Sequence, residues 1–335
     1  TAQTAQNSPD FNFTRDKDQF EDVNVVYHIT HLREHIKALG YPNLPSYQVQ
    51  VDAHALSGSD QSFFSTSVFP YRLYFGEGGV DDAEDADVIL HEFAHAVIYE
   101  AAPTGSKATE RKCIEEALCD YFAASYSLEV STFGGNDVFN WDGHNEFWPG
   151  RSVSTNKDYG QASFKNGNFY AHTDIMASAV TMLTRRLGRD AADQLVLEAC
   201  YFLTSSTTMP EFGRYLLISD SLLNGAANIR VISESFVQRG ILNQVISTAE
   251  YQGMQADIEI MATNRFTNGG QLIIRSTEGL EEILLYDLNG REVAHIQVPG
   301  SAEVHLSGED FQTGLYIILV KNRQGSVLRQ KLLRH

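Results

Sequence analysis

Two histidines separated by three residues lie in an apolar run, His91-Glu92-Phe93-Ala94-His95. If this run is helical, positions i and i+4 lie on one face, so the imidazoles of His91 and His95 can bind the same zinc ion. The carboxylate of Glu92 can then reach a water molecule bound to that ion and act as a general base. The spacing therefore predicts a catalytic zinc centre.

A centre with two histidines needs a third protein ligand, and a second carboxylate-rich segment offers one. Glu116 and Asp120 are four residues apart and would share one face of a helix. We expect Glu116 to bind the zinc and Asp120 to support a ligating histidine. Glu115 lies about 100° further round the helix, which predicts a position on the surface. Three protein ligands would leave one coordination position for water, as in hydrolytic zinc sites.

Zinc-assisted attack on a carbonyl also needs a partner for the negative charge that develops on the oxygen. Tyr170 and His172 lie at the start of a later expected helix, and His172 is the candidate for this role. A purely structural role for His172 is the alternative. Arg151 is a second candidate.

Hydrophobic periodicity predicts the helices that would position these groups. The histidine helix should run from about residue 85 to 101, before Pro103, and the carboxylate helix from about 109 to 125. Further helices are expected at 21–39, 171–187, 190–202, 210–223 and 226–239, and short strands at 47–53 and 71–75. Strands followed by a run of helices predict an α+β catalytic unit.

An acidic run precedes the histidine helix and consists of Asp81, Asp82, Glu84, Asp85 and Asp87. Negative side chains favour the N-terminal end of a helix through its dipole. A calcium site is the alternative interpretation, because this ion binds clustered carboxylates.

The composition changes near residue 243, and short alternating strands follow. Residues 243–256 are predicted to be a linker, and residues 257–335 a small β-sandwich without a catalytic constellation. Asn289-Gly290 and Gln324-Gly325 are the expected hairpin turns. Residues 1–242 would then form the catalytic domain.

The composition of the whole chain excludes several classes of protein. Its 335 residues carry a net charge of −18, which argues against nucleic-acid binding. No run of about 18 apolar residues predicts a membrane span. Cys113, Cys119 and Cys200 are too few for a disulfide framework and are expected to be buried thiols. We expect a monomer.

At the motif residues, the chain resembles the thermolysin and fungalysin group of zinc metallopeptidases, the gluzincins, over roughly residues 20–240. Residues 87–97 are similar to the zinc helix of that family, and residues 115–120 to the segment with its glutamate ligand. Gln61, Ser62 and Phe63 resemble its edge strand, which pairs with an extended substrate. The resemblance implies a strand-rich N-terminal lobe, a helical C-terminal lobe and cleavage of internal peptide bonds, often beside an apolar residue.

The last 80 or so residues resemble the C-terminal sorting domain of the type IX secretion pathway of Bacteroidetes. The resemblance rests on residues 283–291, 314–320 and 330–333. It implies contact with the secretion machinery and export to the cell surface or the medium. A β-rich accessory domain that binds a partner or carbohydrate is the alternative.

Together these features predict a secreted zinc endopeptidase that acts on proteins or peptides. A zinc aminopeptidase, or another zinc hydrolase on the same pair of helices, is the first alternative. An aminopeptidase needs acidic residues that hold the free amine of the substrate, and no family motif for them is visible. A non-catalytic surface or adhesion protein is the second alternative, and the presence of Glu92 argues against it.

Overall fold

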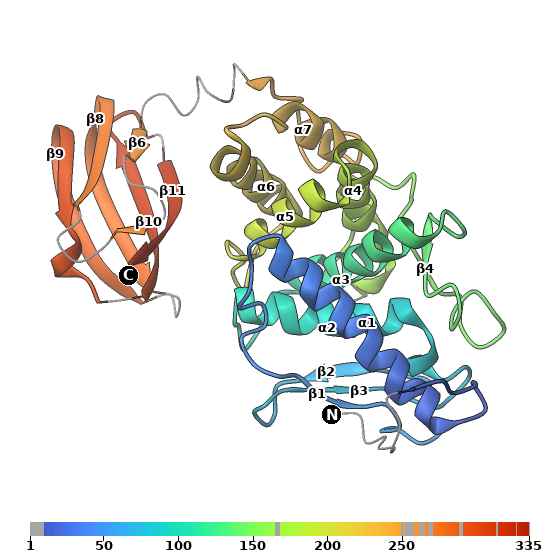
Figure 1. The fold of residues 1–335 in the computed structure, drawn as a ribbon. Coiled ribbons are helices and arrows are strands. Elements are labelled where there is room, and N and C mark those ends of the chain that lie inside the picture. The colour runs from blue at the N-terminus through green and yellow to red at the C-terminus, as the bar shows by residue number, and fades with distance from the viewer. Residues whose placement is uncertain are drawn as a thin grey trace. The chain divides into compact units, whose positions relative to one another are not determined.

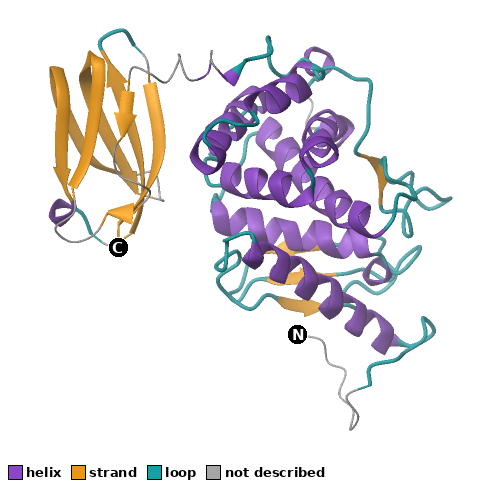
Figure 2. Ribbon diagram, turned by 45° about the horizontal axis from the view of Figure 1, so that its top comes forward, coloured by secondary structure: helices purple, strands orange, loops and turns teal. Residues whose placement is uncertain are grey.

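The structure is a computed structural model that describes residues 10–164, 168–248, 251, 258–260, 265–266, 271–287, 291–312, 314–325 and 327–334. The chain divides into two compact units, residues 1–245 and 246–335. Within the described residues, the first unit is mostly helical with a small sheet, and the second consists mostly of strands (Figures 1 and 2). The predicted α+β fold class is confirmed.

The first unit begins with helix α1 (Asp18–Ala38), followed by a three-stranded sheet. Its strands are β1 (Gln50–Asp52), β2 (Phe63–Ser65) and β3 (Arg72–Tyr74), in the order β1-β3-β2. β1 runs parallel to β3, and β2 runs antiparallel to it. β2 is therefore an edge strand, and within the described sheet its outer side has no neighbouring strand.

Helices α2 (Ala86–Ala101) and α3 (Thr109–Val130) pack against each other beside this sheet (Figure 1). The side chain of Asp85 caps α2 by accepting a hydrogen bond of 2.7 Å from the amide of Asp87. Nearly every residue of α2 is buried, because the helix carries apolar side chains on all of its faces. Both helices were predicted, and α3 continues five residues beyond its predicted end.

Four further helices complete the first unit: α4 (Thr173–Leu187), α5 (Arg189–Cys200), α6 (Met209–Asn224) and α7 (Ile229–Val237). All four were predicted, because residues typical of helix ends mark their boundaries. Gly188 follows α4 with φ of 87°, and Thr208 and Glu211 form a capping box at the start of α6. The cysteines are buried free thiols, as predicted.

The segment between α3 and α4 contains β4 (Asp137–Val138) paired with β5 (Arg151–Ser152). Two acids at the start of α2 hold this segment in place. Asp85 accepts hydrogen bonds from the amides of Trp141 and Asp142, at 3.0 and 2.8 Å, and Asp87 accepts one of 2.9 Å from the amide of Phe139. These carboxylates thus satisfy backbone donors of a long connection that has little secondary structure of its own.

The second unit is built from β6 (Ile258–Ile260), β7 (Arg265–Phe266), β8 (Gln271–Asp287), β9 (Glu292–Ser307), β10 (Gly314–Asn322) and β11 (Val327–Arg334). The strands pair in the order β6-β8-β10-β11-β7, and β9 pairs with β8. The N-terminal half of β8 pairs with β6 and its C-terminal half with β10. Both halves contribute to one core, which is the packing expected of a sandwich.

The sequence predicts separate strands where β8 and β9 run continuously. The two strands bend together at Gly279 and Gly300, which both have φ of 80°. A Cβ atom on Gly279 would lie 3.3 Å from the Cα atom of Gly300, so the bend requires glycine. The expected turn at Gln324-Gly325 is present, with a bond of 3.0 Å from Gly325 to Asn322. The one expected at Asn289-Gly290 lies outside the described residues.

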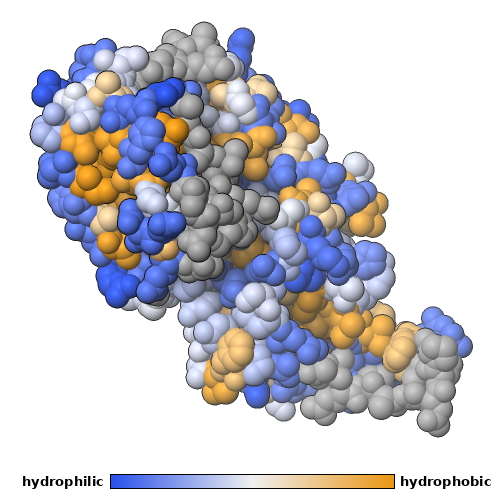
Figure 3. Space-filling view, turned by 60° about the vertical axis from the view of Figure 1, so that its left-hand side comes forward, coloured by the Kyte–Doolittle hydropathy of each residue, from blue (hydrophilic) through white to orange (hydrophobic). Residues whose placement is uncertain are grey.

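Hydrophilic residues cover much of the face drawn in Figure 3, and apolar patches lie between them. This surface agrees with the chain's large excess of acidic over basic residues. None of the described helices is long and apolar enough to span a membrane.

Candidate metal centre

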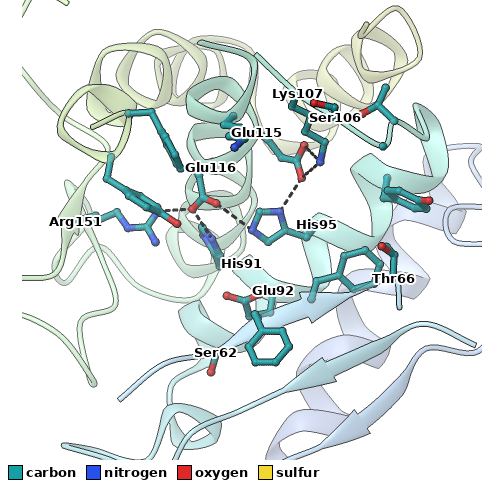
Figure 4. Close-up of a pocket in the computed structure, with 18 residues that line it drawn as sticks. Ser62, Thr66, His91, Glu92, His95, Ser106, Lys107, Glu115, Glu116 and Arg151 are labelled. Atoms are coloured by element: carbon teal, nitrogen blue, oxygen red, sulfur yellow. Dashed lines mark hydrogen bonds and ion pairs between the residues drawn. The ribbon is translucent and has the colours of Figure 1, made fainter. Parts of the chain in front are cut away.

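The structure brings the two motif histidines of α2 together with Glu116 of α3 (Figure 4). The Nε2 atom of His91 lies 3.3 Å from one carboxylate oxygen of Glu116, and the Nε2 atom of His95 lies 3.5 Å from the other. The Glu116 carboxylate of α3 thus faces one imidazole nitrogen from each of the two α2 histidines. This convergence follows from the i, i+4 spacing on α2 and from the contact between the two helices.

The other ring nitrogen of each histidine faces a second carboxylate. The Nδ1 atom of His91 lies 2.9 Å from Asp120, and the Nδ1 atom of His95 makes a hydrogen bond of 3.0 Å with Glu115. A carboxylate at Nδ1 fixes the ring orientation and leaves Nε2 as the donor for a metal. Asp120 and Glu116 thus face the two different nitrogens of the His91 ring.

The prediction that Glu115 lies on the surface is wrong. Glu115 is 6 % exposed, and besides His95 it pairs with Lys107 at 2.6 Å and with Arg111 at 2.8 Å. α3 is covered on several sides, because it packs against α4, α5 and α6 as well as α2. Arg111 lies four residues before Glu115, and this i, i+4 ion pair was a signal in the sequence for a satisfied buried carboxylate.

The electrostatics of the centre reflect this ring of carboxylates. Burial and the Arg151 cation oppose protonation of His91, but Asp120 and Glu116 outweigh them and raise its pKa to about 9. Burial opposes ionisation of Glu116, but the two histidines and Arg151 outweigh it and lower the pKa of Glu116 to about 2. The centre thus has a negative potential that favours positive charge between the imidazoles.

These residues fit a divalent metal ion of the zinc type. Two imidazole nitrogens and one carboxylate are the ligand set of hydrolytic zinc sites. A sulfur ligand is the competing choice, because Cys119 also lies within 4.8 Å of donor atoms of His91 and His95. Cys119 is fully buried, and this burial raises the pKa of its thiol well above the usual value, which disfavours the thiolate that a metal would need.

Glu92 lies beside this centre on α2 and is 7 % exposed. Its Oε2 atom is buried, and no hydrogen-bond partner for it occurs among the described residues. A buried carboxylate oxygen without a partner is costly in a purely structural role. It is the feature expected of a group that receives a proton from a bound molecule.

Two adjoining cavities, of about 510 and 450 Å³, meet at this centre and form a cleft in the first unit. The residues that line both cavities are Ser62, Phe63, His91, Glu92, Arg151 and Tyr170. The predicted substrate strand thus borders the cleft, although β2 itself begins at Phe63, so that Gln61 and Ser62 directly precede it. The hydroxyl group of Ser62 points away from the histidines in Figure 4 and donates a hydrogen bond to Asp82.

Arg151 and Tyr170 line the cleft, whereas His172 does not line either cavity. The Nε2 atom of His172 instead accepts a hydrogen bond of 3.2 Å from the amide of Ser163. Arg151 lies 3.1 Å from Glu116 and 3.0 Å from Asp120, and burial raises the pKa of Tyr170 to about 12. Both side chains therefore keep their protons and are hydrogen-bond donors at neutral pH, next to the zinc ligands that the sequence predicts.

Comparison with known proteins identifies the C-terminal part of the chain. Residues 268–334 match the family of secretion system C-terminal sorting domains. The resemblance of the last 80 or so residues to a sorting domain is thereby confirmed, and so is the expected export to the cell surface or the extracellular medium. No curated protein matches the chain at a significant level.

The structure is similar to that of the precursor of protealysin, a metalloproteinase from Serratia proteamaculans. The TM-score is 0.51 at 13 % sequence identity, and the match covers 69 % of this chain and 81 % of the other. At this identity the likeness concerns the fold. This chain therefore shares the fold of a metalloproteinase precursor over 69 % of its length.

Proposed function

We propose that the chain is an exported zinc-dependent endopeptidase. Residues 1–242 form its catalytic domain, 243–256 a linker, and 257–335 the domain that the secretion machinery recognises. One observation carries the proposal: the two carboxylate oxygens of Glu116 lie 3.3 and 3.5 Å from the Nε2 atoms of His91 and His95, in a cleft bordered by an open strand edge. The metalloproteinase fold of the similar structure supports it.

In the proposed mechanism, His91, His95 and Glu116 would hold a zinc ion, with the carboxylates of Asp120 and Glu115 at the Nδ1 atoms of the two imidazoles. When bound, the ion would polarise the substrate carbonyl and lower the pKa of water. Glu92 takes a proton from the attacking water and delivers it to the nitrogen of the leaving amine, which completes hydrolysis of the peptide bond.

Substrate binding relies on the edge of β2, because an extended peptide can add there as a fourth strand through main-chain hydrogen bonds. Such pairing requires little from the side chains and suits a peptidase with many substrates. Arg151 and Tyr170 donate to the carbonyl oxygen on which negative charge develops. We assign them this role ahead of His172, which does not line the cleft.

The decisive experiment measures hydrolysis of casein and of peptides blocked at both ends by the full chain. We expect activity that a chelator abolishes and zinc restores. Glu92→Gln should retain one zinc per chain and lose activity by about 10²–10⁴-fold or more, because proton transfer is lost while the ligands remain. Equal activity of Glu92→Gln would refute the assignment of the base, and cleavage of unblocked peptides only would favour the aminopeptidase.

A further inference from the structure

The smaller of the two cavities contains three aspartates that the proposed mechanism does not use. Asp60, Asp82 and Asp142 line it together with His91 and Glu92, and one carboxylate oxygen of each lies within 4.8 Å of the others. We call this cavity the acidic pocket. It is continuous with the proposed catalytic centre, since Glu92, Arg151 and Tyr170 line both cavities of the cleft.

Arg151, the basic side chain that lines the acidic pocket, is already paired with Glu116 and Asp120. In the part of the chain that the structure describes, no lysine or arginine forms an ion pair with Asp60, Asp82 or Asp142. Asp142 is 3 % exposed, and its Oδ2 atom accepts a bond of 2.8 Å from Trp148. Its Oδ1 atom is buried and has no hydrogen-bond partner among the residues that the structure describes. A buried, half-satisfied carboxylate among other acids is costly unless a cation binds there.

The walls of the acidic pocket suit a long side chain. Phe63, Phe139 and Trp148 contribute aromatic surface to its lining. Aromatic walls can contact the methylene groups of a lysine or arginine, and their faces attract its cation. A cavity of about 450 Å³ also has the size of a ligand pocket, far above the volume of about 30 Å³ that one water occupies.

We propose that the acidic pocket receives a lysine or arginine side chain of the substrate, at the residue adjoining the scissile bond. The inference rests on the proposed endopeptidase activity and adds a specificity to it. The family resemblance alone implies an apolar residue at the cleavage site. The three aspartates in this chain favour a basic one.

The position of the pocket along β2 indicates which side of the scissile bond it serves. Asp60, Gln61 and Ser62, which precede β2, line the acidic pocket, whereas Phe64 and Thr66 line the other cavity. A substrate that pairs antiparallel with β2, as β3 does, runs in the opposite direction. Its C-terminal part then lies in the acidic pocket, so the basic residue would supply the amine that leaves.

The test also distinguishes two other ligands that the three aspartates could bind, a calcium ion and the free α-amine of a substrate. Calcium takes six to eight oxygen ligands, and the acidic pocket offers three carboxylates with aromatic neighbours. A free α-amine, as in an aminopeptidase, would require the substrate to end at the centre. The second cavity of about 510 Å³ extends the cleft beyond that centre, which favours a chain that passes through.

The experiment uses the full chain and a library of peptides that are acetylated at the N-terminus and amidated at the C-terminus. Mass spectrometry locates each cleavage site, and kcat/KM is then measured for matched peptides with lysine or norleucine after the scissile bond. We expect basic residues to be enriched at that position and a lysine-to-norleucine ratio of about tenfold or more, the scale of one desolvated ion pair.

Asp142→Asn keeps an acceptor for Trp148 and should lower this ratio by about tenfold. Asp60→Asn, at an exposed position, should lower it by less. Glu146→Gln removes the same charge from an exposed residue of the same segment, outside the pocket, and should leave the ratio unchanged. Thermal melting of each variant confirms that the fold is intact.

The outcomes separate the inference from the proposed function. No cleavage of any peptide or of casein would refute the endopeptidase itself. Cleavage without a basic preference, or with a preference that survives both aspartate substitutions, would overturn the inference alone. If calcium abolishes the preference for lysine over norleucine, and if Asp142→Asn no longer binds calcium, the three aspartates form a calcium site instead. Cleavage restricted to peptides with a free N-terminus would assign the aspartates to the α-amine.

Discussion

The zinc-type centre and the acidic pocket both gather carboxylates along one cleft, but their surroundings differ. At the centre, Glu115, Glu116 and Asp120 each face an imidazole and a basic side chain. In the acidic pocket, Asp82 and Asp142 receive hydrogen bonds from neutral donors, and one oxygen of Asp142 has no partner among the described residues. Balanced carboxylates position other groups, whereas unbalanced ones are available to a cation from outside.

The largest effect should come from removing the carboxylate at the point of convergence. Glu116→Ala leaves two histidines without the third ligand, so we expect loss of stoichiometric zinc and of nearly all peptidase activity. Atomic absorption on the purified chain measures the metal. Cys119→Ser is the matched control on the same helix and should retain one zinc per chain. Zinc loss in Cys119→Ser with retention in Glu116→Ala would mean that sulfur is the third ligand.

The second largest effect should come from removing a hydrogen-bond donor that lines the cleft. Removing one donor to a developing oxyanion costs about 10²–10³-fold in kcat. We expect this loss for Tyr170→Phe, which lacks only the hydroxyl group, and a much smaller one for His172→Gln, because His172 does not line the cleft. Steady-state kinetics on a blocked peptide measure both. The reverse order would return the role to His172 and require the segment around residue 172 to move when substrate binds.

A moderate effect is expected from a substitution of Glu115, whose carboxylate makes a hydrogen bond with the Nδ1 atom of His95. Glu115→Gln keeps a hydrogen-bond acceptor for the Nδ1 atom of His95 but removes the negative charge that faces it. Loss of such a supporting group lowers zinc affinity by about 10–100-fold. Competition with a chromogenic chelator measures this affinity. An unchanged affinity would make Glu115 a partner of Lys107 and Arg111 only.

The smallest effect concerns the stability of the fold. The substitutions above remove a function, whereas removing a carboxylate from the acidic pocket should stabilise the protein. Burial raises the pKa of Asp142 to about 6 and that of Asp82 to about 7, above their usual 3.8. An acid whose pKa is raised by folding binds its proton more tightly in the folded state, so stability falls as pH rises from about 4 to 6 or 7.

Asp142→Asn removes this charge and should therefore raise the melting temperature at pH 8 by a few degrees, on the order of 1 kcal/mol. The gain should shrink as pH falls towards 4, where both forms are neutral. Melting curves at pH 5 and pH 8 test this expectation, with Glu146→Gln as the exposed control. A loss of stability at pH 8 would mean that the Asp142 carboxylate is already balanced.

The local part of the centre was predictable because it depends on spacing along single helices. The i, i+4 pairs His91 with His95 and Glu116 with Asp120 fix which side chains share a face. The contact between α2 and α3 then brings these faces together. Glu115 was assigned to the surface because a helical wheel does not show that α3 is covered on several sides.

The long-range part of the cleft was not predictable in the same way. Asp60, Asp82 and Asp142 are separated by 22 and 60 residues, and each alone is an ordinary acid in a polar segment. They meet because Asp85 binds the amides of Trp141 and Asp142, which draws the connection after α3 back to the start of α2. The continuity of β8 and β9 was also not predictable. A glycine such as Gly279 or Gly300 is typical of a turn in the sequence, and only the structure shows that the two glycines lie side by side within continuous strands.

The sequence by itself determined the helices, the ligand spacing on each of them and the sorting domain, because these follow from periodicity and from residue types a few positions apart. Only the tertiary structure decided which carboxylates are balanced, which aromatic groups wall the cleft and that Tyr170 lines it while His172 does not. The physical reason is that charge balance and burial depend on neighbours from other elements, which no local pattern specifies.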